Sequence, residues 1–173
     1  MRANDLNGPV KVTATISAPL LEVWQLISAP GNLTQFHPYC SKNPVTKWQE
    51  ENSRDEVHYY SGLVYEREFY DWIDQTGYDL LIGKHGGERS LVSWRLKEID
   101  NSKCLISIEV RSAFGLRYAK IVRMFIHLFW LRPKLRQYLS AVTKGIKWKV
   151  ESGQNVSQNQ FGFHPWFSGF IGF

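Results

Sequence analysis

The chain has 173 residues, 43% of them hydrophobic and 14% aromatic, which is the composition of one folded domain with a sizeable core. Residues 110–150 carry ten of the 21 basic residues and none of the 16 acidic ones, so the formal charge of +5 belongs to the C-terminal part. We expect no secretory signal and no membrane-spanning segment, because no apolar run is of the right kind or length. The expected location is cytoplasmic, with peripheral membrane contact through the basic region as an alternative.

The N-terminal part predicts one strand and two short helices. Residues 10–17 alternate between apolar and polar side chains, as in a half-buried strand. Pro19 then opens a short helix, which ends before Gly31. A second short helix or turn is predicted over residues 33–36, before the His37–Pro38 step.

The middle of the chain predicts strands joined by short turns. They cover residues 45–50, 57–61, 64–72, 78–83, 90–96 and 104–110. Strands at this spacing indicate a continuous antiparallel meander, so the sheet has about seven strands in all.

The last predicted element is a long amphipathic helix over residues 135–150. Its apolar positions recur three or four residues apart: Leu135, Leu139, Val142, Ile146 and Val150. Pro133 suits the first turn of this helix, because its missing N–H has no partner there in any case. A large twisted sheet curls, and this helix can cover its concave face. The predicted fold class is α+β, with a curved antiparallel sheet wrapped around one C-terminal helix.

Several motifs resemble the START-like (SRPBCC) superfamily, which includes polyketide cyclases and lipid-transfer domains. They are Ile16-Ser17-Ala18-Pro19, Val23-Trp24, Ile27, Pro30, Phe36-His37-Pro38, Glu66, the strand from Ser90 to Trp94, Leu139, Val142 and Gly145. The resemblance implies a helix-grip domain over residues 1–150, followed by an aromatic, glycine-rich tail over residues 151–173. Its members bind or modify apolar and amphipathic ligands between sheet and helix, and many of them are only carriers.

The resemblance therefore implies binding or transport of a hydrophobic or amphipathic small molecule, such as a lipid, an isoprenoid or a polyketide-like compound. The residues expected to contact it are Phe36, His37, Tyr59, Tyr65, Arg67, Phe69, Trp94 and Leu139. Trp24 and Trp94 are also expected in the core. Alternation along the strand puts Tyr65, Arg67, Phe69 and Asp71 on one face. An inward Arg67 would need a partner, either a ligand carboxylate or a carboxylate on a neighbouring strand. Partial solvation of both strand faces is the alternative.

An enzyme of the cyclase or dehydratase type is the alternative function, with His37, Tyr65, Arg67 and Asp71 as candidate acid or base. It predicts a titratable residue with a perturbed pKa in the cavity. Neither a metal nor a cofactor is expected, because the five histidines lack ligand spacing and no glycine-rich phosphate loop exists. The two cysteines form no disulfide pattern, and Cys104 is expected to be buried.

The segment before the long helix and the C-terminal tail are the individual parts of this chain. Arg123, Phe125, Phe129 and Trp130 would suit a bilayer surface or a protein partner, although packing under the sheet is the favoured expectation. The aromatic tail is expected to dock, over an apolar opening or on a second copy in a homodimer. Nucleic-acid binding is not expected, because the basic residues lie on a helix that should be half buried.

Overall fold

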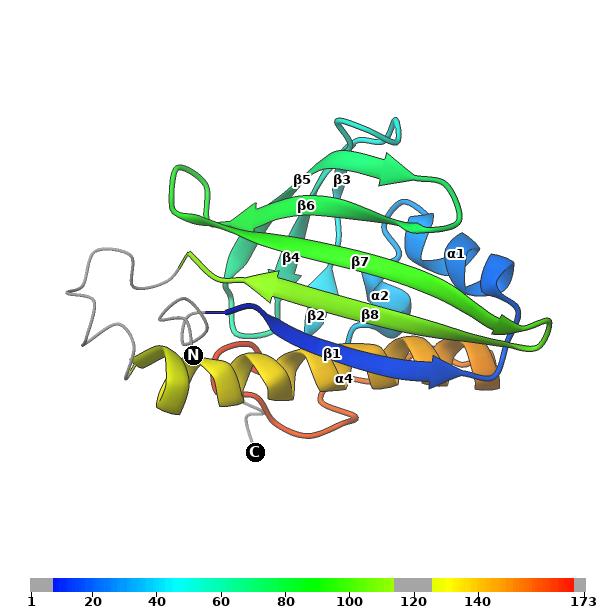
Figure 1. Ribbon diagram of the computed structural model, residues 1–173. Coiled ribbons are helices and arrows are strands. Elements are labelled where there is room, and N and C mark those ends of the chain that lie inside the picture. Colours follow the sequence, from blue (N-terminus) through cyan, green and yellow to red (C-terminus); the bar gives the residue numbers. More distant parts are fainter. Residues whose placement is uncertain (1–7, 114–125, 170–173) are drawn as a thin grey trace.

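The computed structural model describes residues 8–113 and 126–169, which form one curved sheet gripping a long helix (Figure 1). The sheet is antiparallel with the order β1-β8-β7-β6-β5-β4-β2, and β3 also pairs with β4. In chain order the elements are β1 (Val10–Ile16), α1 (Leu20–Ser28), α2 (Leu33–Phe36), β2 (Cys40–Lys42), β3 (Val45–Lys47), β4 (Arg54–Tyr59), β5 (Val64–Ile73), β6 (Gly77–Gly83), β7 (Arg89–Asp100), β8 (Lys103–Arg111), η2 (Ile126–Leu131) and α4 (Arg132–Ser152). The predicted α+β architecture is confirmed.

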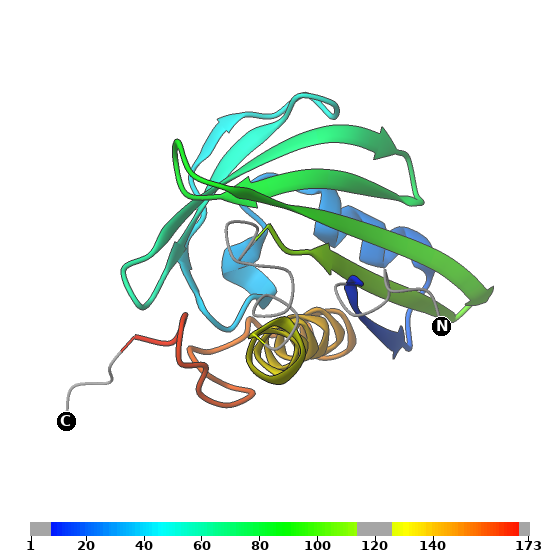
Figure 2. The ribbon, with the colours of Figure 1, turned by 60° about the vertical axis from the view of Figure 1, so that its left-hand side comes forward.

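Helix α4 lies along the concave side of the sheet, as Figure 2 shows from one end. Its apolar stripe is buried at Leu139, Val142 and Ile146, as predicted. The helix also passes very close to α2: a Cβ added at Gly145 would lie 1.8 Å from the carbonyl oxygen of Phe36. Glycine at this position therefore lets the two backbones touch. Pro133 stands in the first turn, and Gly153 ends the helix in the left-handed conformation with φ 73°.

The observed strands differ most from the predicted ones at β2 and at the end of β7. The three-residue strand β2 was missed because it is too short to show an alternating pattern. Strand β7 continues to Asp100, since its pairing with β8 extends through Glu98 opposite Cys104. Both corrections concern backbone pairing, which the side-chain pattern records only indirectly.

A bulge in β5 overturns the predicted strand face beyond Phe69. The register with β6 shifts between Phe69 and Asp71, so two residues of β5 oppose one residue there. Trp72 consequently packs into the concave side, where its ring meets Tyr78 at a centroid distance of 5.2 Å. Asp71 instead lies opposite Asp79. The prediction that Asp71 shares the inward face of Arg67 is therefore wrong.

The described part of the tail, residues 153–169, packs on the same chain. The backbone N–H of Val156 donates to the carbonyl of Gln35 at 2.9 Å, and that of Asn159 donates to the carbonyl of Pro38 at 2.9 Å. The tail then runs beside α4 towards the turn between β4 and β5, where the N–H of Ser61 donates to the carbonyl of Phe167 at 3.3 Å. Among the residues described, no helix is long and apolar enough to cross a membrane.

Candidate functional site

Two aromatic clusters occupy opposite ends of the concave face. The tryptophan cluster, beside α1, consists of Trp24, Trp48, Phe69, Trp72, Tyr78 and Trp94. Two of its donors bond to backbone carbonyls: the Tyr78 hydroxyl donates to that of Ile27 at 3.2 Å, and the Trp48 indole N–H donates to that of Ser28 at 3.2 Å. With these donors satisfied and the rings in contact, the tryptophan cluster is core.

The tyrosine cluster lies at the other end and consists of Tyr39, Tyr59, Tyr65 and Tyr138 with His37. These side chains come from four places in the chain: the segment between α2 and β2, the end of β4, the beginning of β5 and the N-terminal half of α4. Tyr65 and Tyr138 remain partly exposed, whereas His37, Tyr39 and Tyr59 are buried. The cluster therefore combines packed rings with accessible polar tips.

The tautomer of His37 follows from its hydrogen bonds. Its Nδ1 accepts the backbone N–H of Tyr39 at 3.2 Å, so the proton of the neutral ring resides on Nε2. Nε2 lies 2.8 Å from the Tyr138 hydroxyl and donates to it. Burial, with the positive charge of Arg67 as a second cause, lowers the pKa of His37 to about 3. At neutral pH His37 is thus an uncharged donor.

The phenols of the tyrosine cluster stay protonated as well. The hydroxyls of Tyr59 and Tyr138 lie 3.1 Å apart. Burial raises the pKa of both phenols well above the ordinary value. For Tyr59, charge repulsion from Tyr138 raises the pKa as well. Burial also raises the pKa of Tyr65. All three can donate a hydrogen bond at neutral pH, and none is poised to act as a base.

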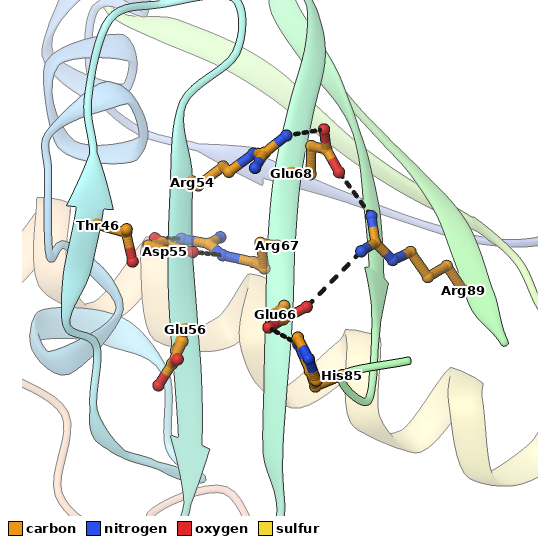
Figure 3. Close-up of a pocket in the computed structure, with 9 residues that line it drawn as sticks. All are labelled: Thr46, Arg54, Asp55, Glu56, Glu66, Arg67, Glu68, His85 and Arg89. Atoms are coloured by element: carbon orange, nitrogen blue, oxygen red, sulfur yellow. Dashed lines mark hydrogen bonds and ion pairs between the residues drawn. The ribbon is translucent and has the colours of Figure 1, made fainter. Parts of the chain in front are cut away.

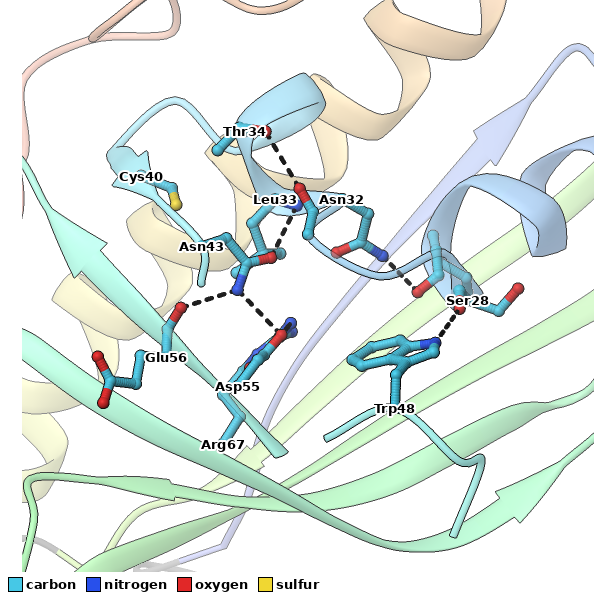
Figure 4. Close-up of polar contacts among 12 residues, drawn as sticks. Ser28, Asn32, Leu33, Thr34, Cys40, Asn43, Trp48, Asp55, Glu56 and Arg67 are labelled. Carbon is cyan, nitrogen blue, oxygen red and sulfur yellow. Dashed lines mark hydrogen bonds and ion pairs between the residues drawn. The ribbon is translucent and has the colours of Figure 1, made fainter. Parts of the chain in front are cut away.

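A buried ion pair separates the two clusters (Figures 3 and 4). The Arg67 guanidinium donates from Nε to Oδ1 of Asp55 at 2.7 Å, and from Nη2 to Oδ2. Asn43 donates to the same carboxylate at 2.9 Å and accepts the backbone N–H of Leu33 at 3.2 Å. The pair thus ties β4 and β5 to the start of α2. Of the two partners expected for Arg67, the carboxylate on the neighbouring strand is the one present, and the alternative of partial solvation is wrong for this residue, which is 4% exposed.

A charged cleft of about 250 Å³ lies over β4, β5 and the turn between β6 and β7 (Figure 3). Its exposed side chains form a ladder in which Glu68 meets Arg54 at 2.7 Å and Arg89 at 2.6 Å. Glu66 meets His85 at 2.6 Å. Hydrogen bonds from the two arginines lower the pKa of Glu68. Since both of these carboxylates are already paired with basic side chains, this cleft is a surface ion-pair network.

The predicted ligand contacts divide between the core and the tyrosine cluster. Phe36, Phe69, Trp94 and Leu139 are core residues, at most 5% exposed. His37, Tyr59 and Tyr65 meet in the tyrosine cluster, and Trp24 is core as predicted. The sequence analysis missed Tyr39 and Tyr138. For Tyr138 a signal existed, because it flanks the apolar stripe of α4 one residue before Leu139.

The tail forms the outer wall of the tyrosine cluster. Phe167 stacks on Tyr59 with ring centroids 4.4 Å apart, and His164 stacks on Phe167 at 5.0 Å. The Tyr39 hydroxyl donates to the carbonyl of Gly162 at 3.1 Å. The expectation that the aromatic tail docks is met within this chain, and sequence patterns offered no sign of where.

The remaining candidates lie elsewhere. Arg123 and Phe125 are outside the described residues, while Phe129 is 70% and Trp130 47% exposed. The expectation that these two pack under the sheet is therefore wrong, because η2 lies beyond the edge of the concave face. Burial raises the pKa of the Cys40 thiol to about 12, which leaves it unreactive, and Cys104 is buried as predicted. Within residues 8–113 and 126–169, no three His, Cys, Asp or Glu side chains group to hold a metal.

No protein-family model matches this sequence, and no curated protein matches it significantly. Solved structures do. A START superfamily protein from Mycobacterium smegmatis has a TM-score of 0.65 and 12% identity, covering 85% of this chain and 99% of that one. DynU16, from the dynemicin biosynthetic locus, has a TM-score of 0.64 and 15% identity, covering 88% of this chain and 51% of its own.

The di-domain ARO/CYC protein StfQ of the steffimycin biosynthetic pathway has a TM-score of 0.59 and 12% identity, covering 83% of this chain and 44% of its own. This chain thus spans about half the length of DynU16 and rather less of StfQ. At such identities the similarity concerns the fold. The sheet curved around α4 and these structural matches together show that the chain has a helix-grip fold, similar to that of the START superfamily protein.

Proposed function

We propose that this protein binds a hydrophobic or amphipathic small molecule between the sheet and α4, at the tyrosine cluster. The carrying observation is that two members of this cluster, Tyr65 and Tyr138, pack against buried rings and yet remain partly exposed. Aromatic walls with a few convergent polar groups are the usual form of a small-molecule site. Two proteins of similar fold come from biosynthetic loci for dynemicin and steffimycin, which favours a polyketide-like ligand over other apolar molecules.

Native mass spectrometry tests this proposal. The purified protein should carry a small molecule, or take one up from a panel of fatty acids, isoprenoids and polycyclic aromatic compounds. Tyr65→Trp, which fills the space beside Tyr59, should abolish uptake, whereas Tyr70→Trp on the convex face should leave it unchanged, since Tyr70 is 45% exposed and packs against no cluster. Absence of any adduct in the wild-type protein, with no uptake from the panel, contradicts the proposal.

The alternative, a cyclase or dehydratase, has one observation in its favour. The expected titratable residue with a perturbed pKa exists, and it is His37. Such an enzyme also needs a group that accepts a proton. The Nδ1 of His37 is held by the Tyr39 N–H, and the phenols are protonated, so the tyrosine cluster supplies donors. We therefore favour binding without catalysis. Conversion of a bound ligand, seen as a mass change in the same experiment, would favour the enzyme over the non-catalytic binding protein.

Peripheral contact with an anionic membrane is a further proposal, supported by the exposed Phe129 and Trp130 beside α4. A groove of about 580 Å³ next to them is lined by Leu128, Arg132 and Arg136 among others. Exposed aromatic side chains next to arginines are typical of an interfacial helix. Sedimentation with phosphatidylserine vesicles should decrease with added salt and on Arg136→Glu, but not on Lys97→Glu, which lies in β7. Equal sedimentation of all three proteins contradicts membrane contact.

A further inference from the structure

The tyrosine cluster holds more hydrogen-bonding protons than its internal hydrogen bonds use. His37 donates from Nε2 to the Tyr138 hydroxyl, because its Nδ1 is occupied as an acceptor. One further hydrogen bond joins the Tyr138 and Tyr59 hydroxyls. Three protons are thus available for two bonds. Whichever of the two tyrosines donates to the other, one hydroxyl proton is left without an acceptor among the described residues.

Tyr65 adds a second such donor beside the first. Its ring packs edge-on against Tyr59 with centroids 5.5 Å apart. Within residues 8–113 and 126–169 its hydroxyl bonds to no other side chain or backbone group. Tyr65 also raises the pKa of Tyr59 and of Tyr138 through its charge, which places the three phenols within electrostatic reach of one another. At this end of the cluster two hydroxyl protons, that of Tyr65 and one of the Tyr59–Tyr138 pair, thus lack an acceptor among the described residues.

The charge of the surroundings limits what these donors can bind. The nearest cation, Arg67, already holds the Asp55 carboxylate with two hydrogen bonds. A ligand carboxylate would consequently lose its hydration without gaining a free counter-charge. A neutral acceptor oxygen loses much less hydration free energy than a carboxylate does. It also accepts a hydrogen bond from a hydroxyl that is otherwise unpaired.

On the basis of the function proposed above, we infer that the tyrosine cluster is a subsite for a neutral acceptor oxygen, such as the carbonyl of a ketone or quinone, on an otherwise apolar ligand. The hydroxyl of Tyr65 and the spare hydroxyl of the Tyr59–Tyr138 pair donate to this oxygen. His37 is a positioning residue, since its Nε2 donates to the Tyr138 oxygen and so leaves the proton of that hydroxyl for another acceptor. The aromatic wall formed by Tyr59 and Phe167 contacts the apolar part.

A matched pair of probes tests the subsite. 2-Acetylnaphthalene carries a ketone, while 2-ethylnaphthalene has nearly the same shape and no acceptor. We expect the ketone to bind about tenfold more tightly in tryptophan-fluorescence titrations, as one or two added hydrogen bonds predict. The infrared carbonyl stretch of the bound ketone should shift to lower frequency than in hexane, which reports the hydrogen bond directly.

Variants locate the effect. Tyr65→Phe breaks no internal hydrogen bond and should reduce the preference for the ketone by roughly threefold to tenfold, with the affinity for 2-ethylnaphthalene unchanged. Tyr70→Phe, on the convex face, is the control and should change neither affinity.

The outcomes separate the two proposals. Equal binding of ketone and hydrocarbon to the wild-type protein overturns the subsite while small-molecule binding stands. Tighter binding of 2-naphthoate than of the ketone overturns the neutral class. No binding of any of the three compounds overturns both the subsite and the proposed function for ligands of this size.

Discussion

The tryptophan cluster and the tyrosine cluster share one concave face and even one strand, since β5 places Tyr65 in one and Trp72 in the other. They differ in where their polar atoms end. In the tryptophan cluster the Tyr78 hydroxyl and the Trp48 indole N–H donate to backbone carbonyls, which only accept. Hydroxyls of the tyrosine cluster bond to one another, and a chain of hydroxyls that begins at a histidine N–H always keeps one proton unpaired. Aromatic content alone therefore does not separate core from site; the partners of the hydroxyl groups do.

The largest effect is expected from breaking the Arg67–Asp55 ion pair, which lies between the two clusters. Arg67→Met leaves the buried Asp55 carboxylate without its cation and should lower the free energy of unfolding by about 3–5 kcal/mol, measured by urea denaturation. Adding Asp55→Asn should recover part of this loss, because it removes the unpaired charge. A loss below about 1 kcal/mol for the single variant would show that the pair is effectively solvated.

The second-largest effect is expected from acid, which should lower the free energy of unfolding through His37 in the tyrosine cluster. The unfolded chain binds a proton at His37 with the ordinary pKa of 6.5, whereas the folded chain does so only near 3. Below pH 6.5 the unfolded state binds more protons than the folded state. The free energy of unfolding therefore decreases as the pH is lowered, by about 2 kcal/mol from pH 7 to pH 5.

Urea midpoints measured across this pH range check the prediction. His37→Gln should flatten the dependence, while His85→Gln, whose side chain is 90% exposed, should leave it intact. The burial of His164 also lowers its pKa and adds a smaller change of the same sign. An unchanged slope in His37→Gln would contradict the neutral, buried state of His37.

The smallest effects sharpen the comparison itself. Tyr78→Phe removes a buried donor from the carbonyl of Ile27 and should cost about 1 kcal/mol of unfolding free energy. Tyr65→Phe removes a hydroxyl without an internal partner and should change the unfolding free energy by less than about 0.5 kcal/mol. Thermal denaturation of both proteins under the same conditions decides the point. Equal losses of unfolding free energy would mean that the two hydroxyls contribute equally to stability.

The candidate site could be predicted only in part. His37, Tyr59 and Tyr65 were expected to contact a ligand and do meet, but Tyr138 was missed although it bonds to two of the groups. Asp71 was placed on the wrong face, because one extra residue in β5 reverses the alternation beyond Phe69. A bulge leaves no distinct mark in a pattern with a period of two.

The sequence by itself determined the fold class, because period-two alternation, short turns and one apolar helical stripe are local signals that each segment carries alone. It also placed Pro133 in the first turn of α4, where the structure has it. Only the tertiary structure decided which polar tips meet. His37 and Tyr138 are 101 residues apart, and their hydrogen bond exists because Gly145 lets α4 touch α2. A hydrogen bond needs atoms about 3 Å apart, a precision that packing sets and that spacing along the chain does not.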